Sequence, residues 1–268
     1  MEKQERKTVI VTGASGGMGK EVCKTLAEKF DVFALDVRPT NLNDDRVTDL
    51  IVDVTDTSSV QKASEIVKNT GKSLFAVIHT AGIYDLDSLI EMDEKRFTKI
   101  FDVNLFGVYR INKAFAPLIE KKGRVIMVTS ELAPLDPLPF TGVYAITKSA
   151  LEKYAYSLRM ELNLLDIKVV VIRPGAVKTT LLNDSTTALD KFVDKTERYK
   201  VNAERFRKIV NSVENKNVKP QKIAKVISKA LSKKNPKYVI NINRNFLLRL
   251  LNVLPHRLQV KIIGKILK

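Results

Sequence analysis

The sequence predicts a single α/β domain in which helices cover both faces of a parallel β-sheet. Short runs of apolar and β-branched residues alternate with longer amphipathic stretches along the chain. Strands that alternate with helices are joined by right-handed crossovers, and such crossovers make neighbouring strands parallel. A chain of 268 residues, 44% of them hydrophobic, can build one such domain. We therefore expect a doubly wound, mostly parallel sheet of seven strands.

The boundaries of the expected elements follow from these patterns. In the first helix, Val22, Leu26 and Phe30 stand four residues apart and so share one face. No linker, repeat or low-complexity segment divides the chain, so we expect one domain over residues 1–243 and a tail over 244–268. The expected strands are 7–13, 31–36, 47–54, 73–82, 123–130, 167–175 and 237–242, and the expected helices are 19–30, 57–70, 93–122, 144–165 and 220–233.

The tail carries nearly all of the net charge of +16. Residues 215–268 contain 14 Lys and Arg and no acidic residue, so the first 214 residues have 32 bases against 30 acids. Arg257, Lys261, Lys265 and Lys268 recur at helical spacing among Ile and Leu, which predicts a basic amphipathic helix. Such a helix suits an anionic membrane surface; docking on the domain or on a subunit partner is the alternative. Nucleic acid is not expected, because the tail lacks interleaved aromatics.

Other features of the composition indicate a reducing, intracellular setting. Cys23 is the single cysteine and cannot form an internal disulfide. The first ten residues mix acids and bases without an apolar run, and no stretch of about 18 apolar residues occurs. We expect a cytoplasmic protein, with peripheral attachment to a membrane as an option, and we predict no metal site.

The stretch TGASGGMGK, residues 12–20, places four glycines directly after the first strand. A glycine-rich turn lets backbone approach a pyrophosphate, and the following helix N-terminus offers free N–H groups. The alternative is a tight strand-to-helix turn with no ligand. The spacing here is G-x-x-x-G-x-G, which differs from the usual G-x-G-x-x-G fingerprint.

Further residues join this turn and together carry a resemblance. Tyr144 and Lys148 share one helix face in "YAITK", and Ser130 ends the fifth strand. Asn104 lies inside the helix in "DVNLFG", and "RPGAVKT" follows the sixth strand. Over about residues 7–240 the chain resembles the short-chain dehydrogenase/reductase family, and within it the hydroxysteroid and retinol dehydrogenases. The fold this implies is the Rossmann-like sheet expected above.

The resemblance implies an acid/base tyrosine. A free tyrosine has a pKa of about 10, and a nearby ammonium favours the phenolate. Tyr144 would be the acid/base, Lys148 would lower its pKa and bond the nicotinamide ribose, Ser130 would hold the substrate oxygen, and Asn104 would anchor a water. Ser130 is one residue farther from Tyr144 than the family's usual serine. Glu131 stands at the usual spacing, but its charge would repel an alkoxide. Ser130 is therefore preferred, and Thr129 is its alternative.

The resemblance also implies a nicotinamide dinucleotide. Asp36 ends the second strand, where a carboxylate accepts ribose hydroxyls and repels a 2′-phosphate. NAD is therefore expected. NADP is the alternative, because Arg38 stands two residues after Asp36 and would tolerate the 2′-phosphate. Thr12 would tie the glycine turn to a neighbouring strand, and His79 is interpreted as structural. The cofactor-binding positions implied are Gly13, Ser15, Gly17, Met18, Gly19, Asp36, Asp53, Val54, Ala81, Gly82, Tyr144, Lys148, Pro174, Gly175, Val177 and Thr179.

The predicted function is an NAD(P)-dependent interconversion of a secondary alcohol and a ketone. Residues 180–215 replace the family's lid over the substrate, and they are long and amphipathic. This favours a lipophilic substrate such as a steroid, retinoid or fatty alcohol. The alternative is a dinucleotide-binding regulatory or membrane-surface scaffold protein with little turnover. The helices expected at 93–122 and 144–165 commonly pair between subunits in the family, so we expect a homodimer or homotetramer.

Overall fold

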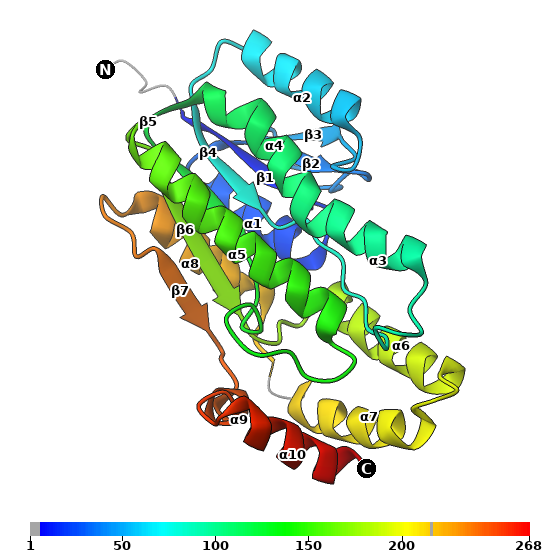
Figure 1. Cartoon of the computed structure of the whole chain (residues 1–268). Helices are drawn as coiled ribbons and strands as arrows, with labels where there is room; N and C mark the ends of the chain where they lie inside the picture. The colour runs from blue at the N-terminus through cyan, green and yellow to red at the C-terminus, as the bar shows by residue number, and fades with distance from the viewer. Residues whose placement is uncertain (1–5, 215–216) are drawn as a thin grey trace.

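The computed structural model of the chain describes residues 6–214 and 217–268, without the side chains of 180–185 and 212–214. Its centre is a sheet of seven strands, all parallel, in the order β3-β2-β1-β4-β5-β6-β7 (Figure 1). The predicted doubly wound sheet is therefore confirmed. The strands are β1 Thr8–Thr12, β2 Asp31–Asp36, β3 Val47–Ile51, β4 Leu74–His79, β5 Ile119–Val128, β6 Lys168–Pro174 and β7 Val239–Ile242.

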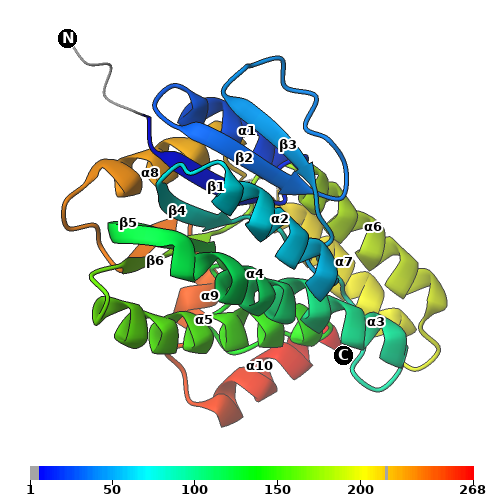
Figure 2. The ribbon, with the colours of Figure 1, turned by 90° about the horizontal axis from the view of Figure 1, so that it is seen from above.

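Alternate residues of each strand feed two separate hydrophobic layers. Val9 and Val11 of β1 pack with α1 (Gly17–Ala27) and α8 (Pro220–Ser232) on one face of the sheet. Ile10 points to the other face, toward α2 (Thr57–Asn69), α4 (Gly107–Phe115) and α5 (Gly142–Asn163). Figure 2 shows the strands between these two helical layers. The period of two along each strand thus produces both cores from one sheet.

The predicted helix over residues 93–122 is wrong in its last seven residues, 116–122. It comprises α3 (Glu94–Phe101), a π-helical turn at Asp102–Phe106 and α4, which ends at Phe115. A short 3-10 turn, Ala116–Leu118, follows and contains Pro117. Proline has no N–H to continue the α-helical ladder, so the chain leaves the helix there and enters β5. The apolar pattern did not show this break because it runs on from helix to strand.

The lid and the tail form a third layer beyond the carboxyl ends of the strands (Figure 1). The elements of this layer are α6 (Thr180–Lys195), α7 (Lys200–Glu214), α9 (Phe246–Leu251) and α10 (His256–Leu267). Phe140 stands at the centre of its hydrophobic cluster, where its ring meets those of Phe192 and Phe206 at centroid distances of 4.7 and 5.5 Å. Residue 215 of the predicted lid and residues 1–5 of the predicted domain lie outside the described residues.

The tail is docked on the domain through hydrogen bonds. Asn202 of α7 donates to the Leu267 carbonyl at 2.7 Å, and Gln259 donates to the Asp136 carboxylate at 2.9 Å. The predicted basic helix of the tail is α10, with Pro255 as its N-cap, and a shorter helix, α9, precedes it. Among the described helices, none has the length and apolarity needed to cross a membrane.

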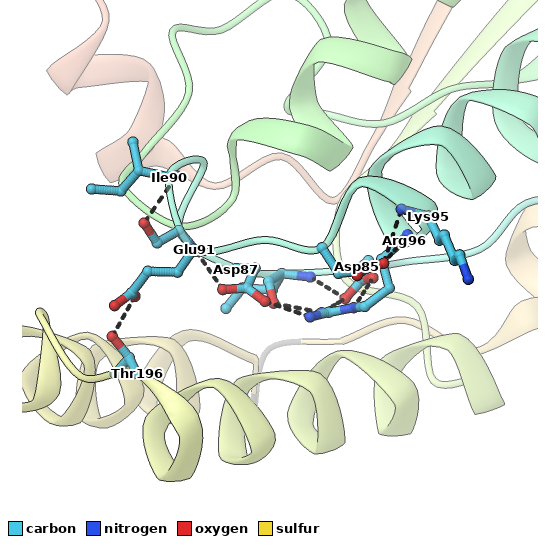
Figure 3. A network of polar contacts seen from close by, with 10 residues as sticks. Asp85, Asp87, Ile90, Glu91, Lys95, Arg96 and Thr196 are labelled. Carbon is cyan, nitrogen blue, oxygen red and sulfur yellow. Dashed lines mark hydrogen bonds and ion pairs between the residues drawn. The ribbon is translucent and has the colours of Figure 1, made fainter.

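A polar network ties the loop after β4 to the lid (Figure 3). The Arg96 guanidinium donates to both oxygens of Asp85, at 2.6 and 3.0 Å, and also bonds Asp87. Glu91, farther along the same loop, accepts the hydroxyl of Thr196 at the end of α6 at 2.7 Å (Figure 3). The loop is therefore fixed at both ends, once to α3 and once to the lid.

Phe140→Ala should lower the free energy of unfolding by about 3–5 kcal/mol, because it leaves a cavity among three aromatic rings. Chemical denaturation with an unchanged m-value measures this change. The matched control is Phe246→Ala, at a side chain that is 68% exposed, which should stay within about 0.5 kcal/mol of wild type. Equal effects of the two variants would contradict the placement of Phe140 in the core of the third layer.

Candidate active site

The glycine turn presses backbone against backbone at the carboxyl end of β1. Gly13 has φ of +67°, and a Cβ there would lie 2.5 Å from the Cα of Ala81. A Cβ on Gly19 would lie 2.1 Å from the Gly13 carbonyl oxygen. Thr12 Oγ1 accepts the Ala81 N–H at 3.3 Å, which agrees with its predicted role of tying the turn to the next strand. The turn is thus built so that α1 starts directly at the sheet edge.

The first turn of α1 offers unpaired backbone donors beside this edge. Gly16 is its N-cap and makes no side-chain capping bond. The N–H groups of Gly17, Met18 and Gly19 belong to the first turn, where a helix supplies no acceptor of its own. Donors of this kind, at the positive end of a helix dipole, suit a pyrophosphate. The glycine turn therefore fits the phosphates of a dinucleotide.

Asp36 stands at the end of β2, where the ribose of such a dinucleotide is expected. Its Oδ2 accepts the Ser15 N–H at 3.0 Å, and its Oδ1 accepts the Arg38 N–H at 3.3 Å. These bonds hold the carboxylate at the cleft. A cavity of about 460 Å³ at this place is lined by Gly13, Ser15, Gly17, Met18, Gly19, Asp36, Asp53, Val54, Ala81, Gly82 and Thr179.

A second cavity, of about 260 Å³, continues the first. Residues of the glycine turn, of the loop after β4 and of the loop after β6 line both, so the two cavities form one cleft. The shared residues are Met18, Thr80, Gly82, Ile83 and Thr179. The second cavity gathers the remaining predicted positions that line the cleft, which are Ser130, Tyr144, Lys148, Pro174, Gly175 and Val177.

Asn104 lies beneath the cleft rather than in its wall. The π-helical turn turns its amide toward the loop after β4, where Oδ1 accepts the Ile83 N–H at 2.8 Å and Nδ2 donates to the Ile83 carbonyl at 2.9 Å. Nδ2 also reaches Thr147 Oγ1 at 3.2 Å. The side chain therefore joins three segments that carry the site.

Burial dominates the electrostatics of Tyr144 and Lys148. It raises the pKa of Tyr144 to about 12, against the opposing effect of a hydrogen bond with Ser130. It lowers the pKa of Lys148 to about 8. The Lys148 Nζ donates to the Val128 carbonyl at 3.4 Å and lies 5.6 Å from the Tyr144 ring centroid. Burial is therefore the main influence on the pKa of Tyr144 in the protein alone, and the predicted lowering of that pKa by Lys148 stays a prediction.

The hydrogen bonds distinguish Ser130 from its alternative, Thr129. Ser130 Oγ accepts the Leu132 N–H at 3.2 Å, and its hydroxyl is close enough to Tyr144 to influence the pKa of that phenol. Thr129 instead donates its hydroxyl to Glu152 at 2.9 Å, beside the Arg173–Glu152 ion pair. Only Ser130 of the two therefore presents its hydroxyl to Tyr144. The arrangement can hold one substrate oxygen between two hydroxyls and move a proton to or from it.

His79 has the structural place that the sequence indicated. It is buried in β4, its Nε2 lies 2.9 Å from Asn112 Oδ1, and burial lowers its pKa to about 4. The imidazole is therefore neutral throughout the physiological range. It does not line either cavity of the cleft.

Sequence reasoning expected a lid over the substrate at residues 180–215, but it missed the part of the cleft that the start of α9 supplies. Phe206, Ile209 and Val210 of α7 line the second cavity, and so do Asn245 and Leu248 at the start of α9. The apolar stretch "FLLRLL" signalled a buried face on the tail. It could not show which part of the domain that face covers.

The comparisons with known proteins agree with this geometry. Residues 7–190 match the family described as short chain dehydrogenase. The chain is 28% identical over 232 residues to 3-ketodihydrosphingosine reductase of Bacteroides thetaiotaomicron, covering 86% of this chain and 85% of the relative. It is 37% identical over 192 residues to estradiol 17-beta-dehydrogenase 2 of Mus musculus, covering 66% of this chain and 50% of the relative.

Among solved structures, a short-chain dehydrogenase from Streptomyces avermitilis has the same fold, with a TM-score of 0.76 at 22% identity. The match covers 98% of both chains. The family match spans well over half of this sequence and includes the glycine turn, Ser130, Tyr144 and Lys148. The chain therefore belongs to the short chain dehydrogenase family, and it is an oxidoreductase that acts on CH–OH and keto groups with NAD or NADP.

Proposed function

We propose that the protein interconverts a lipophilic secondary alcohol and its ketone, with Tyr144 as the acid/base. One observation carries this proposal: Ser130 and Tyr144 both line the wall of a cavity that continues the dinucleotide cleft. A substrate oxygen placed between their hydroxyls would receive two hydrogen bonds at once. The apolar surroundings strengthen both of them.

The bound dinucleotide would supply or accept the hydride, and the protein supplies position and a proton. In ketone reduction Tyr144 donates its phenolic proton to the developing alkoxide, and Ser130 stabilises the negative charge on that oxygen. A phenol with a raised pKa stays protonated at neutral pH, which suits the donor role. The Lys148 ammonium, when charged, stabilises the phenolate left behind.

Tyr144→Phe should lower kcat by about 10²–10⁴-fold, the usual contribution of a positioned acid/base. Turnover by the wild type should fall as pH rises through about 8, because Lys148 then loses the charge that stabilises the phenolate. Both are measured from the absorbance of the reduced cofactor with a ketone panel of steroids, retinoids and fatty ketones.

The matched control is Tyr156→Phe, on the exposed face of α5, which should retain full turnover. A Tyr144→Phe variant as active as the control would remove Tyr144 from the reaction. A rate that keeps rising above pH 8 would contradict the role given to the Lys148 charge.

We propose NAD as the preferred cofactor, with NADP bound more weakly. The support is the Asp36 carboxylate, fixed at the cleft by the Ser15 and Arg38 backbone and placed where it would oppose a 2′-phosphate. Position 16 is glycine, so the turn carries no base of its own beside the ribose.

Asp36→Ala should weaken NADH binding about tenfold or more, since a charge-assisted hydrogen bond contributes about 1.5–3 kcal/mol. The variant should also narrow or reverse the preference for NADH over NADPH, because it removes the repulsion between the Asp36 carboxylate and the 2′-phosphate. Calorimetric titration of both dinucleotides into wild type, Asp36→Ala and the exposed control Asp45→Ala gives the comparison. Tighter binding of NADPH than NADH by the wild type would overturn the assignment.

We propose a lipophilic substrate because apolar side chains from the loops after β5 and β6, from α7 and from α9 close the second cavity. They are Leu132, Leu138, Val177, Phe206, Val210 and Leu248.

We also propose that the tail beside this cavity attaches peripherally to an anionic membrane. Phe246, Leu247 and Val253 are 68%, 68% and 81% exposed, and the same tail carries Lys261 and Lys265 among its bases.

The Phe246→Ser, Leu247→Ser double variant should bind anionic vesicles at least tenfold more weakly, because burial of each large apolar side chain contributes about 1.5–3 kcal/mol. Sedimentation with vesicles of phosphatidylcholine and phosphatidylserine measures the partition. A matched control is Ile66→Ser, at an exposed apolar residue on α2. Wild-type protein that does not sediment with these vesicles would end the membrane proposal.

We propose a homo-oligomer formed through α5, whose exposed side chains include Tyr156 and Met160 and which is followed directly by the exposed Leu164 and Leu165. Exposed apolar side chains of this kind suit burial between subunits. Sedimentation velocity at micromolar concentration should give a mass of at least twice the 30.2 kDa of one chain. Sedimentation as a monomer of 30.2 kDa would contradict it.

A further inference from the structure

Glu131 is the one acidic side chain among the described residues that line the substrate cavity. The other charged side chain in that lining is Lys148, which the proposed reaction already uses. The remaining described residues are apolar side chains, glycines, hydroxyl groups and the Asn245 amide. A carboxylate in such surroundings needs a partner, because an unpaired buried charge is costly.

The position of Glu131 is fixed by the backbone around it. Its N–H donates to the Pro174 carbonyl at 2.8 Å, which joins the end of β5 to the end of β6. Its Oε2 accepts the Asn245 N–H at 2.5 Å, at the start of α9. Its Oε1 lies against Gly175, where a Cβ would come within 2.8 Å of it. The carboxylate is therefore held beside the segment that follows β6.

One oxygen of this carboxylate is available to a ligand. Within the described part of the chain, Oε2 has its hydrogen bond from Asn245, whereas no protein donor is bonded to Oε1. Arg244 acts on the carboxyl electrostatically but forms no ion pair with it within 4.0 Å in the described residues. Burial raises the pKa of Glu131, as expected for a carboxyl whose charge is incompletely compensated.

Glu131 directly follows Ser130 in the chain, and both residues line the same cavity. Resting on the proposed oxidoreductase function, we propose that Glu131 is a specificity-determining residue that selects substrates with an ammonium group near the carbinol or keto carbon. The substrate class is a long-chain amino ketone or amino alcohol: the ammonium pairs with Glu131 and the alkyl chain occupies the apolar part of the cavity.

This pairing would also limit the repulsion between Glu131 and the alkoxide held by Ser130. A neighbouring ammonium neutralises the carboxylate before the negative charge develops on the substrate oxygen. A substrate without the ammonium would bring an alkoxide close to an uncompensated carboxylate. The amine therefore favours both binding and the transition state.

The test uses two long-chain 3-ketones that differ only by an amino group at carbon 2, with the full-length protein. Wild type should reduce the amino ketone with a kcat/KM at least tenfold higher than that of the plain ketone. Glu131→Gln keeps the shape and the acceptor for the Asn245 N–H but removes the charge. It should lower kcat/KM for the amino ketone about 10–100-fold, the effect of a charge-assisted hydrogen bond, and leave the plain ketone within about threefold.

The control variant separates recognition from attachment of the tail. Asp136→Asn removes a carboxylate that bonds Gln259 of the tail but does not line the cavity. It should leave the preference for the amine unchanged. Equal losses on both ketones in Glu131→Gln, or the same loss of preference in Asp136→Asn, would show that Glu131 acts only by holding the tail, and would overturn the proposal.

A binding measurement keeps this inference separate from the reaction itself. Octylamine and 1-octanol are titrated into wild type and Glu131→Gln by calorimetry, with NADH present throughout. Wild type should bind the amine at least tenfold more tightly, and the variant should lose that difference. If neither ketone is turned over but the amine preference depends on Glu131, the proposed reaction fails and the site stands. If the wild type binds octylamine no more tightly than 1-octanol, the proposed ammonium site is wrong, whether or not either ketone is turned over.

Discussion

The parallel pairing of β1 with β2 on one side and β4 on the other is the constraint on which the rest of this structure depends. Parallel strands end at one edge, so the glycine turn, Asp36 and the loop after β4 meet there although they are distant in sequence. β1 is buried along its whole length, and its alternate residues hold two helical layers in place. A shift of one residue in its register would exchange these layers and also move the turn away from β4.

Desolvation has opposite consequences at the two ends of the cleft. At the dinucleotide end, the orphan N–H groups of α1 and the Asp36 carboxylate stay accessible, so the site there can bind charge without a large cost of burial. At the catalytic end, Tyr144 and Lys148 are buried, which raises one pKa and lowers the other, so both groups favour their neutral forms. Because the pKa of Lys148 is still about 8, its ammonium prevails at pH 7, whereas the Tyr144 phenol, with a pKa of about 12, is neutral there.

The sequence predicted the sheet and the gathering of the site because those depend on local patterns. β-branched runs, the glycine turn and the spacing of Tyr144 and Lys148 are each readable within a few residues. The π-helical turn at Asn104 and the helix end before Pro117 were not predicted, since the apolar pattern continues through both. The burial of Tyr144, which raises its pKa, was also not predicted. It depends on how completely side chains of α3 and of the loop after β4 cover the ring, and spacing along a helix carries no information on that.

The third layer links the tail to the chemistry of the site. Glu131 accepts the backbone N–H of Asn245 with one oxygen, so the residue that limits which charges enter the cavity also fixes the start of α9. Leu248 of the same helix lines the cavity, whereas Phe246 and Leu247 face outward. A single short helix thus has one side against the substrate space and the other toward the surroundings. Movement of α9 would strain the Asn245–Glu131 hydrogen bond, so the position of this helix and the placement of the carboxylate that lines the cavity depend on the same contact.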